Sequence, residues 1–252
     1  MSLMELRHEL DWRLQNILKI SAPVLKRTGV AWNTLQSGLA IPQTARLHEL
    51  SARYDLTLWP QVCSRDEMLV NLYTLDISDR YFPDAPQTGP ALDIGAGNWS
   101  YLPAQLSWSH SAWDAVELDA HRRYWTLSTR RAHAAYMMRL CNDCRYFAGS
   151  LLEVRGAYSL ITWFLPYILP IAQRATGLPQ RYFQPRELLA HAWSLLTPGG
   201  VLFIVNQGAM EEREQQRLCH DAGIETQPLG ELRSVFSRFT KPRFGLRIFR
   251  MP

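Results

Sequence analysis

Two glycines and two acidic residues in the middle of the chain have the types and spacing of a cofactor-binding site. An apolar stretch that includes Asp93 runs into Gly95-Ala96-Gly97, and a second apolar stretch ends at Glu117, 24 residues after Asp93. Because glycine has no Cβ, Gly95 and Gly97 allow a sharp turn and a close approach of the backbone to a ligand. A carboxylate about 20 residues after such a turn can receive ribose hydroxyls. The pattern therefore predicts a cofactor that carries a ribose.

Asp93 discriminates between two classes of cofactor. In a dinucleotide-binding motif the third glycine would fall at Ser100, and an acid pointing toward the pyrophosphate would repel it. A carboxylate suits a cofactor with a cationic amine instead. The stretch Asp93-Ile94-Gly95-Ala96-Gly97 resembles the first motif of class I S-adenosylmethionine-dependent methyltransferases, and Val116-Glu117-Leu118-Asp119 resembles their second.

This resemblance implies which residues hold S-adenosylmethionine. Asp93 would lie at the methionine end, and Glu117 would accept hydrogen bonds from the ribose, with Asp119 as the alternative. Trp99 stands where many members have a third glycine, and it either lines the cofactor site or packs in the core. Ser150 stands where many members have an acid that binds the adenine amine. The expected cofactor contacts are Asp93, Gly95, Ala96, Gly97, Asn98, Glu117, Leu118, Ser150, Leu151 and Trp163.

Further strands and helices follow in the order that this family has. Residues 145–150 and 158–164 read as strands, and Pro198-Gly199-Gly200 separates a helix from a fifth strand. A helix is expected over about 120–140, with Asp119 as its cap. Residues 237–251 alternate around Lys241-Pro242-Arg243 as in an antiparallel hairpin. Alternating strands and helices predict an α/β fold, a doubly wound, seven-stranded, mostly parallel Rossmann-like sheet over about residues 87–252.

The first 86 residues have the pattern of a separate helical extension. Leu3, Leu6, Leu10, Leu14, Ile17 and Leu18 recur at helical spacing. Ser64-Arg65-Asp66-Glu67 resembles a capping box that opens a second helix, and residues 81–90 form a linker with proline and glycine. The extension is expected to be a lid or substrate platform over the carboxyl ends of the strands, or else a packing element or dimer contact.

The segment after the fourth strand is where this family places groups that face the methyl acceptor. Here it reads Trp163-Phe164-Leu165-Pro166-Tyr167. It has no polar side chain to orient a nucleobase amine, which disfavours base N-methylation, and no acid, which disfavours aminopropyl transfer. Phe164, Pro166 and Tyr167 instead form an apolar, aromatic wall for a flat or apolar small molecule. No histidine has a spacing that marks it as a catalytic base.

Composition and charge limit the remaining alternatives. A chain of 252 residues with 47% hydrophobic residues can bury a full core, and no apolar run reaches the roughly 20 residues of a membrane span. We expect a cytoplasmic location, no metal site and reduced cysteines. Two arginine clusters, one within 122–139 and one within 233–250, make RNA, such as ribosomal RNA, the second choice of acceptor. The prediction is thus a methyltransferase of unidentified acceptor, with a non-catalytic cofactor-binding protein as a further alternative.

Overall fold

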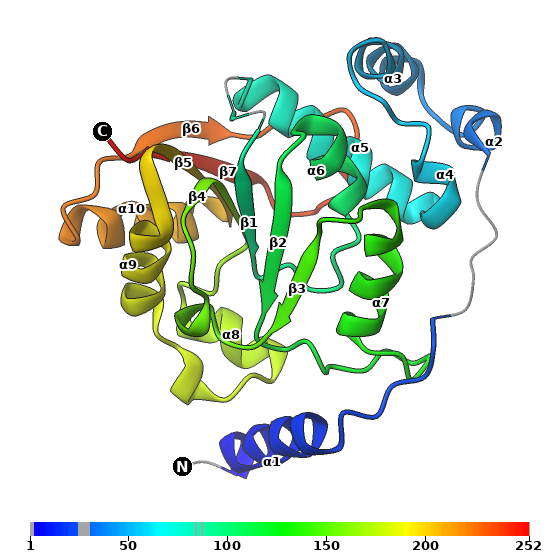
Figure 1. Ribbon diagram of the computed structural model, residues 1–252. Helices are drawn as coiled ribbons and strands as arrows, with labels where there is room; N and C mark the ends of the chain where they lie inside the picture. Colours follow the sequence, from blue (N-terminus) through cyan, green and yellow to red (C-terminus); the bar gives the residue numbers. More distant parts are fainter. Residues whose placement is uncertain (1–2, 25–30, 84, 87, 252) are drawn as a thin grey trace.

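Seven strands form one sheet in the order β3-β2-β1-β4-β5-β7-β6 (Figure 1). The computed structural model describes residues 3–24, 31–83, 85–86 and 88–251. The parallel strands are β1 (Pro90–Ile94), β2 (Ala112–Glu117), β3 (Arg145–Ala148), β4 (Tyr158–Phe164) and β5 (Leu196–Gln207). Antiparallel pairing joins β7 (Arg243–Phe249) to β5 and to the edge strand β6 (Gln227–Glu231). The predicted doubly wound sheet with a C-terminal antiparallel hairpin is confirmed.

The hairpin itself differs from the one expected within residues 237–251. Its first strand is β6, and residues 232–242 connect it to β7. The segment Lys241-Pro242-Arg243 is therefore not the turn of the hairpin. Pro242 has no N–H to donate to a ladder, and its carbonyl accepts a hydrogen bond from the Gly208 amide at 2.9 Å. Regular pairing with β5 consequently begins only at Arg243.

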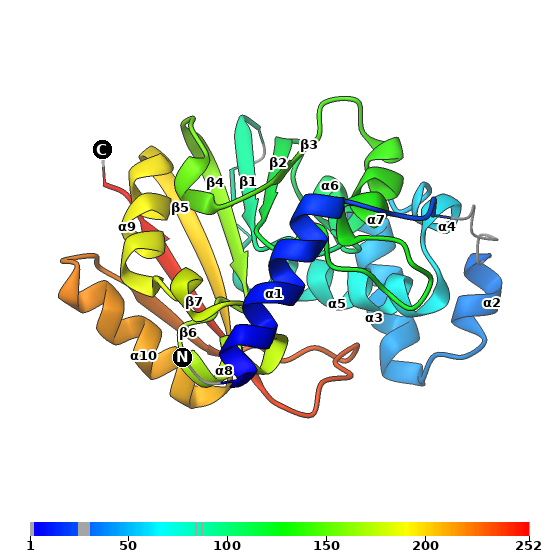
Figure 2. The ribbon, with the colours of Figure 1, turned by 90° about the horizontal axis from the view of Figure 1, so that it is seen from below.

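Alternate residues of the central strands enter two separate cores, one on each face of the sheet. On β1, Ala91 joins the core beneath α5 (Arg65–Tyr81) and α6 (Leu102–Trp108). Leu92 joins the core beneath α9 (Pro185–Leu195) and α10 (Gly208–Asp221). Figure 2 shows these helices on opposite sides of the strands. Burial on both faces explains the near-continuous apolar runs of the parallel strands.

Helix α5 is part of the cover of the sheet. It begins with the predicted capping box, in which the Ser64 amide donates to Glu67 at 2.8 Å. Asn71 ties α5 to the start of α6: its side chain donates to the Ser100 carbonyl before that helix at 2.7 Å and accepts from the Ala104 amide in its first turn at 2.8 Å. Beyond the end of α5, Phe82 stacks on Phe203 of β5. These helices and the sheet therefore share one core.

The boundary between residues 1–86 and 87–252 remains a prediction. Positions 84 and 87, within the expected linker, lie outside the described residues. Between residues 31 and 64 lie the helices α2 (Trp32–Gln36), α3 (Ile41–Arg53) and α4 (Trp59–Val62). Hydrophobic residues of all three helices join the core beneath α5.

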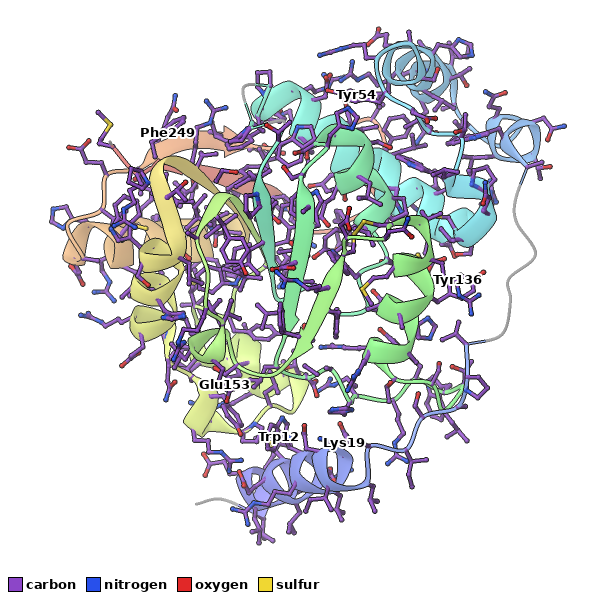
Figure 3. All side chains as sticks on the ribbon, in the orientation of Figure 1. Trp12, Lys19, Tyr54, Tyr136, Glu153 and Phe249 are labelled. Atoms are coloured by element: carbon purple, nitrogen blue, oxygen red, sulfur yellow. A yellow bond between two sulfur atoms is a disulfide. The ribbon has the colours of Figure 1, made fainter. Side chains whose placement is uncertain are left out.

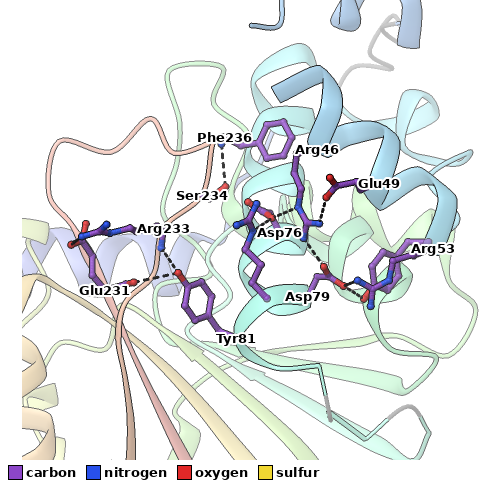
Figure 4. A network of polar contacts seen from close by, with 12 residues as sticks. Arg46, Glu49, Arg53, Asp76, Asp79, Tyr81, Glu231, Arg233, Ser234 and Phe236 are labelled. Atoms are coloured by element: carbon purple, nitrogen blue, oxygen red, sulfur yellow. Dashed lines mark hydrogen bonds and ion pairs between the residues drawn. The ribbon is translucent and has the colours of Figure 1, made fainter. Parts of the chain in front are cut away.

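A buried ion network ties α3 to α5 (Figure 4). The Arg46 guanidinium donates to Asp76 at 2.6 Å and to Asp79 at 2.5 Å. Asp79 also forms an ion pair with Arg53. Asp76 is fully buried. Breaking such a pair leaves an uncompensated charge in the interior, so the network strongly constrains how α3 sits on α5.

The helix expected over residues 120–140 is much shorter than predicted. The chain from 120 to 129 is a loop closed by a bridge between Arg123 and Thr129, and α7 (Arg130–Met137) follows it with the short helix η1 (Met138–Leu140). Thr129, not Asp119, caps α7 by accepting the Ala132 amide at 3.2 Å. The arginines of residues 122–139 therefore do not lie on one helix.

The expectation of reduced cysteines is also wrong for one pair. Cys141 and Cys144 form a disulfide, because the turn after η1 brings their Cα atoms to 5.7 Å. Cys63 and Cys219 are buried. Within the described ranges, no group of three or more His, Cys, Asp or Glu side chains could hold a metal ion. In the same ranges, every helix is too short or too polar to cross a bilayer.

Candidate functional site

An open cavity of about 850 Å³ lies at the carboxyl ends of the parallel strands. Open α/β sheets bind their ligands at this edge, outside the ends of the strands. Of the thirteen residues predicted to bind cofactor or acceptor, only Asp93 does not line the cavity. The twelve that do are Gly95, Ala96, Gly97, Asn98, Glu117, Leu118, Ser150, Leu151, Trp163, Phe164, Pro166 and Tyr167. Residues from four separate strand ends therefore meet around one space.

The glycine turn after β1 has the conformation that its sequence predicted. Gly95 and Gly97 have φ angles of 72° and 58°, and a Cβ at either position would meet no atom within 4 Å. The turn thus leaves an open cradle in the cavity wall. Trp99 has a φ of 52°, in the left-handed region that favours glycine, where an L-residue costs about 1–2 kcal/mol. Trp99 is fully buried and donates to Gln105 at 2.8 Å. It therefore packs in the core and does not line the cofactor site.

Glu117 reaches the cradle from the end of β2. One carboxylate oxygen accepts the Gly97 amide at 2.8 Å. The other accepts the Asp119 amide at 2.7 Å and the Arg130 guanidinium at 3.2 Å. A carboxylate has about four acceptor positions, so these contacts leave one open and a second that becomes open if Arg130 moves. The Asp119 side chain forms an ion pair with Arg122 and does not line the cavity.

Asp93 lies under the turn, where two hydroxyl groups bind its carboxylate. Thr162 donates to one oxygen at 2.6 Å and Tyr101 donates to the other at 2.8 Å. Burial raises the pKa of Asp93 to about 7, against the lowering effect of these hydrogen bonds. Tyr101 lines the cavity, and its pKa is raised by burial, so the hydroxyl stays protonated. Sequence reasoning missed Tyr101, because a single aromatic residue after the turn has no distinguishing pattern.

The expected adenine side of the cavity has a well-defined local structure. Ser150 follows β3 and caps the short helix η2 (Leu151–Glu153) by accepting the Leu152 amide at 3.2 Å. Its hydroxyl can still donate a hydrogen bond into the cavity that it lines. Leu118 and Leu151 add apolar surface beside it.

An apolar wall closes the other side. Trp163 and Phe164 end β4, and the chain then turns through Leu165, whose φ is 57° and whose amide donates to the Val205 carbonyl at 2.7 Å. Helix α8 (Pro170–Thr176), the short helix η3 (Gln180–Tyr182) and Met210 of α10 extend the wall. The sequence did not reveal the contribution of α8, since its residue types are those of any short amphipathic helix.

Comparisons with known proteins do not identify an acceptor. No protein-family model matches the chain, and no curated protein matches it. Among solved structures, a SAM-dependent methyltransferase from Aquifex aeolicus is 12% identical, with a TM-score of 0.48 and coverage of 81% of this chain and 98% of that chain.

Two further solved structures have different acceptors in their descriptions. A putative RNA methyltransferase from Pyrococcus horikoshii is 16% identical, with a TM-score of 0.44 and coverage of 84% of this chain and 97% of that chain. A geranyl diphosphate C-methyltransferase from Streptomyces coelicolor is 13% identical, with a TM-score of 0.48 and coverage of 86% of this chain and 95% of that chain. The assignment of the fold therefore depends on the strand order and directions. They are those of the class I methyltransferase fold.

An N-terminal strap, defined here as residues 3–22, crosses the cavity end of the sheet (Figure 2). Its helix α1 (Leu3–Leu18) is held near one side of the cavity, where Glu9 pairs with Arg181 and the Trp12 ring lies 4.8 Å from that of Tyr182. Figure 3 shows Trp12 on the side of α1 that faces the sheet. Beyond α1, the Ala22 amide donates to the Leu127 carbonyl at 3.0 Å in the loop before α7. The strap thus bridges two segments that flank the cavity.

Three histidines that could act as a base by residue type alone are not at this site. His121, His133 and His191 all lie outside the cavity lining. His133 contacts Ser128 and His191 contacts the Val154 carbonyl, which are structural positions. The carboxylate at the far end of the cavity is Glu211, which accepts the Gln207 amide at 2.9 Å and whose pKa is raised by burial.

Proposed function

We propose that this protein binds S-adenosylmethionine at the glycine turn and transfers its methyl group to a flat or apolar small molecule. The observation that carries the proposal is the meeting of Gly95, Gly97 and Glu117 around one cavity, with an aromatic wall opposite. Its volume of about 850 Å³ is at the upper end of the range for small-molecule sites.

The residues present fit this cofactor in three respects. The open cradle at Gly95 and Gly97 admits a ligand close to the backbone. Glu117 has an acceptor position for one ribose hydroxyl, and displacement of Arg130 provides another. Below the turn, Asp93 supplies a carboxylate whose charged form a cationic amine at the methionine end would stabilise through Tyr101, which lines the cavity.

The chemistry requires little from the protein beyond alignment. When bound, S-adenosylmethionine would supply an electrophilic methyl group and a neutral thioether as the leaving group. Trp163, Phe164 and Tyr167 would orient the acceptor and exclude water. Burial raises the pKa of Tyr101 and of Tyr167, so both hydroxyls stay protonated at neutral pH and neither can act as a base. An acceptor that already carries a lone pair suits this site best.

The C-terminal arginines favour a small molecule over RNA, because several of them have structural partners. Arg243 lies 4.4 Å over the Phe239 ring, and Arg247 donates to the Tyr81 carbonyl at 2.6 Å. Arg250 contacts carbonyls at the end of α9, and Arg238 pairs with Asp66. Groups held in this way are poorly placed to contact phosphates.

Transfer of labelled methyl groups tests the proposal. The protein is incubated with methyl-labelled S-adenosylmethionine and a cell extract that has been divided into small molecules and RNA. We expect label in the small-molecule fraction, and we expect Tyr167→Ala to raise the acceptor KM more than the cofactor Kd. Label in RNA would favour the alternative acceptor. Cofactor binding without any transfer would identify a non-catalytic binding protein.

A further inference from the structure

Helix α1 turns its polar side to the protein and its apolar side to solvent. The residues half-buried against the body are Glu5, His8, Glu9, Trp12, Gln15 and Asn16. The apolar stripe, defined as Leu3, Leu6, Leu10, Leu14 and Ile17, is between 41% and 88% exposed. At about 100° per residue, the two sets lie on opposite sides of the helix. A continuous exposed stripe of this kind marks an interaction surface.

The spacing of the apolar stripe is symmetric. Its members follow one another at intervals of three, four, four and three residues, with Leu10 at the centre. An identical helix laid antiparallel across it would therefore place Leu10 against its own copy, Leu6 against Leu14 and Leu3 against Ile17. Self-complementary contacts of this kind are what a two-fold axis requires, and apolar knobs at such intervals pack in a two-helix seam.

The charges beside the stripe fit a second copy as well. Arg7 and Asp11 lie on one side of the stripe and already attract each other within the helix at 3.6 Å. In the antiparallel arrangement Arg7 is level with Arg13 of the second copy, but Arg13 lies on the other side of the stripe. Asp11 of the second copy lies on the same side as Arg7, about 3 Å of helix rise away. Residues 3–18 contain three acids and two arginines. They therefore lack the basic surface that binding to anionic lipid requires.

We propose that two copies of this chain form an isologous dimer by pairing their α1 helices antiparallel through the apolar stripe. The opposite side of α1 keeps its contacts with Arg181 and Tyr182, so one helix faces its own cavity and the second copy at the same time. Pairing would thereby hold the N-terminal strap of each copy across its cavity.

Sedimentation of the full chain over a concentration series tests the pairing. We expect the parent protein to approach twice its chain mass of 29.0 kDa. Leu10→Glu should lower the mass to that of one chain, because it places two like charges on the axis. Ile41→Glu is the matched control, since Ile41 is 87% exposed on α3, and it should leave the dimer unchanged. A parent protein of single-chain mass at all concentrations, or a Leu10→Glu variant that stays dimeric, overturns the proposal.

Cysteine crosslinking tests the direction of pairing. Under mild oxidation Leu10→Cys should crosslink to itself, and Leu3→Cys should crosslink only when mixed with Ile17→Cys. Background crosslinking through the native cysteines should be low, because Cys63 and Cys219 are buried. Self-crosslinking of Leu3→Cys would indicate parallel helices and contradict the symmetric arrangement. Binding of neutral or anionic vesicles through the stripe, with no dimer in solution, would assign it to a lipid surface instead.

Discussion

At the scale of single residues, Asp93 departs from the ordinary chemistry of a carboxylate. Its carboxyl is fully buried, and burial raises its pKa from 3.8 to about 7. Between about pH 4 and about pH 7 the folded chain therefore binds more protons at this site than the unfolded chain does. The free energy of unfolding should fall as the pH rises through this interval and level off above it, by up to about 4 kcal/mol for this group.

Replacement of Asp93 by asparagine isolates this contribution. Asp93→Asn removes the charge and keeps a side chain that can hydrogen-bond to Thr162 and Tyr101. Relative to the parent, the variant should gain stability as the pH rises from about 5 to about 8, as measured by urea unfolding at each pH. A stability difference between parent and variant that does not change with pH would show that Asp93 titrates normally.

At the scale of single elements, the sequence indicated which segments are strands because burial on both faces leaves a strong apolar signal. The loop of residues 120–129 gave a false helix signal, because its arginines and alanine are good helix formers and Asp119 is a good cap. What decides against a helix there is distant in sequence, because Arg122 binds the Thr176 carbonyl. The apolar stripe likewise predicted α1 correctly but not which side faces the protein.

The N-terminal strap yields a prediction at the same scale. No residue of 3–22 is buried, so removing residues 1–22 should leave the thermal unfolding and cofactor affinity close to those of the parent. Acceptor turnover should fall, because the strap crosses the cavity end of the sheet and would help to exclude water. Removal of residues 1–86 is the informative contrast, since it exposes the core shared with α5 and should give insoluble protein. Unchanged turnover after removal of residues 1–22 would contradict the proposed lid.

For the whole molecule, charge distribution decides between the two acceptor classes. The chain has a formal charge of +4, yet the C-terminal arginines largely contact rings, carbonyls and acids. We expect weak RNA binding in filter assays, with little dependence on salt, because few counterions are released. If the cluster does contact phosphates, replacing Arg243 and Arg247 should reduce the log–log salt slope by about one per lost contact. A steep slope that these substitutions reduce would reverse the order of the two acceptors.

The site as a whole was more predictable from sequence than its surroundings. The glycine turn and Glu117 follow strand ends directly, and parallel strands bring their carboxyl ends to one edge. Tyr101, α8 and the N-terminal strap reach the same edge through tertiary packing, which local spacing does not encode. The central claim, that this edge binds S-adenosylmethionine, therefore depends most on Glu117.

Calorimetric titration with S-adenosylhomocysteine tests that claim most directly. The parent protein should bind the ligand, and Glu117→Ala should weaken binding by roughly 1–3 kcal/mol through loss of a charged acceptor. Glu187→Ala, an exposed carboxylate on α9, is the matched control and should bind as the parent does. Thermal unfolding of each variant confirms that the chain is folded. Unchanged affinity in Glu117→Ala would remove Glu117 from the site, and no binding to the folded parent would contradict the proposed cofactor.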